Sequence, residues 1–165
     1  MEPFEEGDFH ALSDGLCSDP QYDDRRLVAR RRLAAVAKAG CAAVAAATGG
    51  AVGLLSRTSL HRPHAFNGMR VRRLWAYLAR EKRAKTRLRR VLGPELAKDL
   101  DAAYRNAYLC VALERDALEV SLRIHQDAWY DGQNLVNRVG RSDAELDRWI
   151  EVLNALDGYF LRLAD

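Results

Sequence analysis

The chain has 165 residues, of which 48% are hydrophobic, and a formal net charge of +3. This length suits a single domain with a substantial core, and the hydrophobic fraction argues against global disorder. The three cysteines (Cys17, Cys41 and Cys110) are dispersed and form no C-x-x-C pair. An odd number of dispersed cysteines suits a reducing compartment and argues against a disulfide framework or a zinc site.

The beginning of the sequence is acidic, whereas secretory signals and transit peptides begin with a basic segment. We therefore expect a cytoplasmic protein, or a nuclear one if the source is eukaryotic or viral.

Charge is distributed in three blocks that the net value conceals. Residues 1–24 carry eight acidic residues and no Lys or Arg, whereas residues 25–90 carry eighteen basic residues and only one acid, Glu81. Residues 91–165 carry eight basic and fourteen acidic residues. Because like charges along a helix repel, the central block needs a counter-charge from nucleic acid, from anionic lipid or from the chain's own acidic segments.

The first two predicted elements are an arm and a helix. Glycine, proline and aspartate interrupt any helical pattern in residues 1–24, which predicts an acidic, flexible or loosely packed arm. A helix is expected over about 24–48, because aspartate favours a helix N-terminus and apolar residues recur at helical spacing in its second half. The apolar run 34–55 is long enough for a membrane span, but its alanine content and Gly49-Gly50 favour a core helix instead.

Residues 49–66 read as a connection that contains His61 and His64. An H-x-x-H pair can bind metal, but no third ligand is suitably spaced, so exposed loop histidines are the favoured interpretation. A second helix is expected over about 67–92, ending at Gly93-Pro94. Its stretch 80–87 is so rich in Lys and Arg that it should project from the core or lie against a polyanion.

Two further helices are predicted over about 94–139 and 143–164. The first begins just after Gly93, with Pro94 in its first turn, and acids such as Asp127 and Asp131 are interpreted as part of a solvated face. The second begins with a capping-box pattern from Ser142 to Glu145 and continues with a heptad-like apolar seam. The seam favours packing inside the domain, with dimerisation through this helix as the alternative.

These elements predict an all-α, single-domain helical bundle of about four helices. The sequence contains no phosphate-binding loop, dinucleotide fingerprint, H-E-x-x-H pattern or activated cysteine. We therefore expect a non-catalytic protein without cofactor or metal.

The basic block predicts a nucleic-acid-binding surface with backbone-directed, weakly sequence-specific contacts, to RNA or DNA. Trp75 and Tyr77 lie within it and could stack on unpaired bases, although neighbouring leucines favour a core position for Trp75. The alternatives are an adaptor or scaffold that docks an acidic protein or self-associates, and, least favoured, a peripheral membrane protein. The candidate contact residues are Arg25, Arg26, Arg30, Arg31, Arg32, Arg70, Arg72, Arg73, Arg80, Lys82, Arg83, Lys85, Arg87, Arg89 and Arg90.

Overall fold

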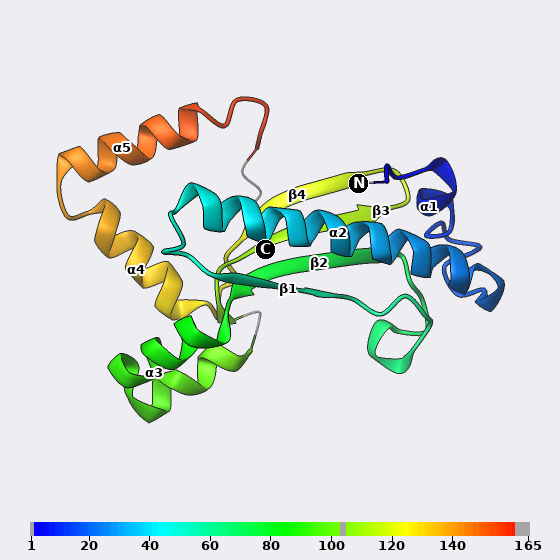
Figure 1. Cartoon of the computed structure of the whole chain (residues 1–165), viewed down its shortest axis with the longest axis horizontal. Helices are drawn as coiled ribbons and strands as arrows, with labels where there is room; N and C mark the ends of the chain where they lie inside the picture. Colours follow the sequence, from blue (N-terminus) through cyan, green and yellow to red (C-terminus); the bar gives the residue numbers. More distant parts are fainter. Residues whose placement is uncertain (1, 103–104, 161–165) are drawn as a thin grey trace.

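A computed structural model describes residues 2–102 and 105–160 of the chain. It has a mixed α/β architecture built on a four-stranded antiparallel sheet of order β1-β2-β3-β4 (Figure 1). The all-α prediction is therefore wrong. The strands are β1 (Leu54–Thr58), β2 (Arg73–Arg80), β3 (Tyr108–Glu114) and β4 (Leu118–Arg123).

Helices precede, interrupt and follow this sheet. The α-helices are α1 (Glu6–His10), α2 (Asp23–Ala47), α3 (Lys82–Ala97), α4 (Trp129–Val139) and α5 (Asp143–Asn154). Short 3-10 helices occupy Pro20–Tyr22, Ala65–Asn67 and Lys98–Asp101. The helix expected over 24–48 thus coincides with α2, whereas the ranges expected as helices over 67–92 and 94–139 contain three of the strands.

Strand β2 shows why the helical interpretation failed. Leu74, Ala76 and Leu78 alternate along the strand and are buried, as period-two side chains on one sheet face should be. The same segment also places Leu74 and Leu78 four residues apart, which matches a helical face equally well. Antiparallel pairing with β1 and β3 decides between the two periods, and this pairing is a long-range property of the chain.

The core lies between α2 and one face of the sheet. Ala29, Leu33 and Ala37 of α2 pack against Leu74, Val111 and other buried residues of β2 and β3. Small side chains on α2 allow it to approach the sheet closely: the position where a Cβ on Gly40 would lie is 3.1 Å from Leu78 Cδ2. The long helix therefore forms the second layer of an α/β sandwich (Figure 1).

The N-terminal segment packs on this core. Ala11, Leu12 and Cys17 are buried, and the Val71 backbone N–H donates a 2.7 Å hydrogen bond to the Cys17 carbonyl. The acidic segment expected as a loosely packed arm is thus tied to α2 and to the loop before β2.

The apolar run 34–55 does not continue as one helix. Helix α2 ends at Ala47, and Gly49 and Gly50 follow with φ of 57° and 78°, a left-handed conformation that glycine adopts without strain. Among the described residues, none of the helices combines the length and hydropathy that a membrane crossing requires.

Helices α4 and α5 form a hairpin beyond one end of the sheet (Figure 1). Asp131, interpreted from the sequence as a solvated acid, is buried instead: its carboxylate accepts hydrogen bonds from Arg80 and, at 2.6 Å, from the Ala107 backbone N–H. The Ser142 hydroxyl accepts a hydrogen bond from the Glu145 backbone N–H, so α5 starts where the capping pattern placed it. The helix ends at Asn154, and the last part of the predicted range, 161–164, lies outside the described residues.

Candidate nucleic-acid interface

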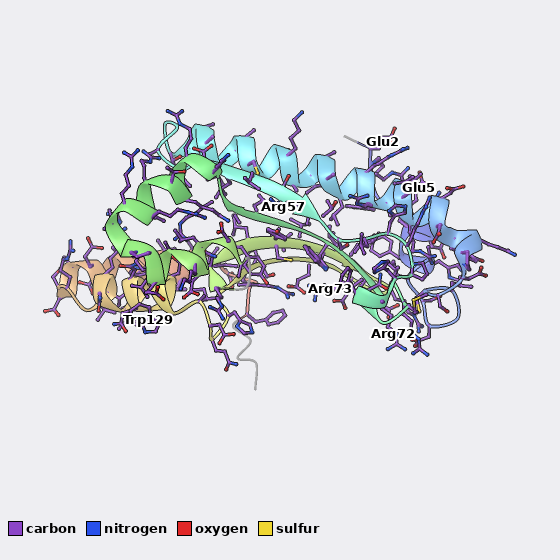
Figure 2. The ribbon with its side chains drawn as sticks, turned by 90° about the horizontal axis from the view of Figure 1, so that it is seen from below. Glu2, Glu5, Arg57, Arg72, Arg73 and Trp129 are labelled. Carbon is purple, nitrogen blue, oxygen red and sulfur yellow. The ribbon has the colours of Figure 1, made fainter. Side chains whose placement is uncertain are left out.

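The arginines at the start of α2 meet the chain's own acidic segment. Arg32 binds Asp8 at 2.6 Å and Glu5 at 2.7 Å, and Arg25 binds the same two carboxylates at 3.1 and 2.7 Å. Asp8 is fully buried. Figure 2 shows Glu2 and Glu5 beside this end of α2. These two candidate contact residues therefore already have internal counter-charges.

These ion pairs also shift the pKa values of Glu5 and Arg32. Hydrogen bonds from Arg25 and Arg32 lower the pKa of Glu5, and the hydrogen bonds to Asp8 and Glu5 raise the pKa of Arg32. Both groups therefore remain charged at neutral pH.

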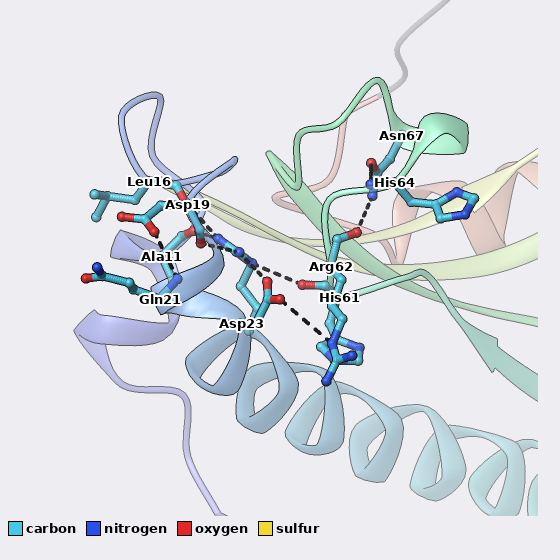
Figure 3. Close-up of polar contacts among 10 residues, drawn as sticks. Ala11, Leu16, Asp19, Gln21, Asp23, His61, Arg62, His64 and Asn67 are labelled. Atoms are coloured by element: carbon cyan, nitrogen blue, oxygen red, sulfur yellow. Dashed lines mark hydrogen bonds and ion pairs between the residues drawn. The ribbon is translucent and has the colours of Figure 1, made fainter.

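Arg26 is fully buried although the sequence indicates a surface position. Its guanidinium donates to the backbone carbonyls of Ala11, Leu16, Asp19 and His61 and, at 2.6 Å, to the Asp23 carboxylate. Figure 3 shows these acceptors converging from the N-terminal segment and the loop before β2. Arg26 thus joins three segments of the fold and is not accessible to a ligand.

Arg30 and His61 form a second internal contact. Arg30 donates a 2.8 Å hydrogen bond to the Thr58 hydroxyl, and its guanidinium lies 3.4 Å from the Nδ1 atom of His61. Burial, together with the charge of Arg30, lowers the pKa of His61. His64 caps the Ala65–Asn67 turn through a hydrogen bond from the Phe66 N–H. Both loop histidines therefore have structural partners.

The candidate arginines around β2 are partly neutralised. Arg73 binds Glu114 and Glu119 at 3.2 and 2.8 Å, and Arg80 pairs with Asp131. Arg72 forms a 3.1 Å ion pair with Asp14 in which both side chains are exposed. Arg70 is exposed, as is Arg31 on α2, and within the described part of the chain neither has an ion-pair partner.

Helix α3 carries the remaining candidate contact residues. In the part of the chain that the structure describes, five of its basic side chains form no ion pair: Lys82, Arg83, Lys85, Arg87 and Arg90. All of them are exposed except Lys85, which is partly buried. Arg89 of this helix pairs with Asp101. The helix stands at the end of the molecule away from the acidic segment (Figure 1).

The charge of α3 extends onto the sheet through Arg57. Burial lowers the pKa of Lys85, and the positive charges of Arg57, Arg89 and Arg80 lower it further against the opposing effect of Asp101. Arg57 is exposed on β1, where it pairs in register with Tyr77 of β2. The positive charges of Lys85 on α3 and Arg57 on β1 therefore repel each other.

That second sheet face carries a row of aromatic side chains. The ring centroids of Trp75 and Tyr77 lie 5.3 Å apart, and those of Tyr77 and Tyr108 lie 5.8 Å apart. All three rings are half-buried. Because Trp75 and Tyr77 alternate with the buried Leu74 and Ala76, they point away from α2. Trp75 therefore lies outside the core beneath α2.

Sequence reasoning missed Arg57, Tyr108 and Asp131. The apolar run from Tyr108 to Leu113 has the length of a buried strand, which is the signal that could have placed Tyr108 beside Tyr77. Arg57 and Asp131 carried no comparable signal, because their positions depend on strand pairing and on the docking of α4.

The described residues contain no group of three or more His, Cys, Asp and Glu side chains placed to hold a metal ion. Comparison of the chain with protein-family models, with curated proteins and with solved structures finds no match.

Proposed function

We propose that this protein is a non-catalytic nucleic-acid-binding protein whose contact surface is α3. The observation that carries the proposal is the set of five basic side chains on this helix that form no ion pair with any described residue: Lys82, Arg83, Lys85, Arg87 and Arg90. Phosphates supply such counter-charges, and the release of condensed counterions makes the contact favourable whatever the base sequence. Binding is therefore backbone-directed and weakly sequence-specific.

The aromatic row indicates a single-stranded ligand. Unpaired bases stack on aromatic rings with about 1–3 kcal/mol per base, whereas the bases of a duplex are already stacked on one another. A strand that lays its phosphates along α3 can continue past Arg57 to Tyr77 and Trp75. We place this activity in the cytoplasm, because an odd number of dispersed cysteines suits a reducing compartment.

The test is fluorescence anisotropy with a labelled single strand of about 16 nucleotides and a duplex of the same length. We expect binding of the single strand at about 50 mM salt that weakens steeply by about 200 mM. The variant Arg83→Glu/Lys85→Glu/Arg87→Glu should lose about 100-fold in affinity, because three phosphate contacts become repulsive.

A matched control carries the same change in net charge elsewhere. Lys38→Glu/Arg115→Glu/Arg141→Glu reverses three exposed basic residues outside α3 and should change the affinity by less than about threefold, because general steering by net charge is weak beside direct contact. Tyr77→Leu should weaken the single strand about tenfold and leave the duplex unchanged.

Two results would contradict the proposal: no binding of the wild-type protein at low salt, or equal losses in the α3 variant and its charge-matched control. Binding of polyglutamate but not of nucleic acid, abolished by the α3 variant, would also overturn it and would assign α3 to an acidic protein partner.

A further inference from the structure

Helix α2 covers only part of the sheet face on which it packs. It lies on β1 and β2 and contacts β3 more sparsely. The pairing of β3 with β4 places Leu118, Val120 and Leu122 on this same face, opposite Leu113, Val111 and Leu109. Yet Leu118, Val120 and Leu122 are 48%, 55% and 60% exposed, whereas Val111 is 7% exposed. We call these three side chains the β4 face.

Helix α5 also exposes a row of apolar side chains. Leu146, Ile150 and Leu153 follow one another at four- and three-residue steps, so they share one side of the helix. These side chains are 43%, 46% and 59% exposed, and we call them the α5 face. Helix α5 packs against α4 and makes no comparable contact with the described part of the sheet.

The two faces match in length as well as in chemistry. Twelve helical residues extend about 18 Å, and the six residues of β4 extend about 20 Å. A helix laid along a strand would thus bury both apolar rows together, as α2 does on β1 and β2. Exposed contiguous apolar surface of this kind marks an interaction site.

The chain's own hairpin is held away from the β4 face. Asp131 fixes α4 at the end of the sheet through Arg80 and the Ala107 backbone N–H. In Figures 1 and 2, α4 and α5 lie beyond that end of the sheet, not over the face that α2 shares. A second copy offers the same helix without this restraint.

We propose that two copies of this chain form a symmetric dimer in which the α5 face of each copy covers the β4 face of the other. A twofold axis closes both contacts at once, so no apolar row remains open. The symmetric dimer contains two helix-on-strand contacts, so its buried area is twice that of one contact. Stable interfaces bury roughly 1,200–2,000 Å² in total. This inference is independent of nucleic-acid binding.

The experiment is light scattering coupled to size exclusion, after nuclease treatment and in high salt so that nucleic acid cannot bridge two copies. We expect twice the chain mass of 18.6 kDa for the wild-type protein. Val120→Lys and Leu153→Glu should each yield monomers, because each places a charge in both symmetric contacts. Circular dichroism should show that both remain folded, since both positions are exposed in the single chain.

Mixing the two variants provides the decisive measurement. In a mixed dimer, one contact joins two unaltered faces, and the other joins the new lysine to the new glutamate, so the mixture should regain the dimer mass. Phe66→Lys, at an almost fully exposed residue remote from both faces, should leave the dimer intact. A monomeric wild-type protein, dimeric single variants, or a mixture that stays monomeric would each overturn the proposal.

Discussion

The two arginine-rich helical segments lie at opposite ends of the molecule and differ in their neighbours more than in their composition (Figure 1). At the start of α2, Arg25 and Arg32 each bind Glu5 and the buried Asp8, and Arg26 is enclosed by backbone carbonyls. At the start of α3, Arg83 and Arg87 have no acidic partner among the described residues. Arg25, Arg26 and Arg32 of the first segment are thus held by contacts within the fold, whereas Arg83 and Arg87 of the second are exposed.

The difference teaches that a run of basic residues does not by itself define a binding surface. Such a run becomes a surface only where the fold brings no acid to it. The acidic segment 2–24 packs beside α2 and cannot at the same time reach α3. The following predictions test this division, beginning with the largest expected effect.

Replacing Arg26 by methionine should cost about 3–5 kcal/mol of unfolding free energy, because the Asp23 carboxylate and four backbone carbonyls would lose the hydrogen bonds that the buried guanidinium donates. Urea denaturation followed by circular dichroism measures this loss. Arg31→Met, five residues along the same helix at an exposed position, should change the unfolding free energy by less than about 0.5 kcal/mol. A similar loss of unfolding free energy in both variants would show that the contacts of Arg26 do not stabilise the fold specifically.

Like those of α2, the arginines of the sheet should stabilise the fold through internal ion pairs. The Glu119 carboxylate should make this contribution to the unfolding free energy depend on pH. Burial raises the pKa of Glu119, but hydrogen bonds from Arg123 and Ser121 and the charge of Arg73 outweigh it and lower the pKa from 4.5 to about 2. A carboxylate with a depressed folded-state pKa stabilises the fold above its unfolded value of 4.5 and loses that contribution as the pH falls towards 2.

We therefore expect Glu119→Gln to lose about 1 kcal/mol at neutral pH, an estimate reduced for the partial exposure of the side chain. The difference from the wild-type protein should vanish near pH 2, as measured by urea denaturation across the acid range. A difference that stays constant with pH would exclude an ionic origin.

The smallest effect should come from removing the ion pairs that Glu5 forms with Arg25 and Arg32 of α2. Glu5→Gln leaves Asp8 in place but removes one counter-charge from Arg25 and Arg32, so affinity for single-stranded nucleic acid should rise about two- to threefold. Asp116→Asn removes an equal charge from an exposed pair with Arg115 and should leave the affinity unchanged. Deleting residues 1–24 would be a poorer test, because Ala11, Leu12 and Cys17 belong to the buried interior.

Local signals located several element boundaries but not the element types between them. The aspartates before α2 and the Ser142 cap before α5 act within one helical turn, so the chain alone specifies them. The segment around Leu74 and Leu78 fits a helix and a strand equally well, and pairing with β1 and β3 selects the strand. The predicted contact surface likewise included arginines that pair with acids inside the fold, because ion pairs between distant segments leave no local signal in the sequence.

By itself, the sequence determined that charge is segregated, that a long alanine-rich helix begins near Asp23, and that a strongly basic segment begins near Arg80. Only the tertiary structure decided that acids of the N-terminal segment pair with three arginines of α2, whereas five basic side chains of α3 form no ion pair with the described residues. It also decided that Trp75 and Tyr77 line a sheet face and that the β4 face is exposed. The physical reason is range: helix starts and charge content depend on neighbouring residues, whereas counter-charges and burial depend on which distant segments the fold brings together.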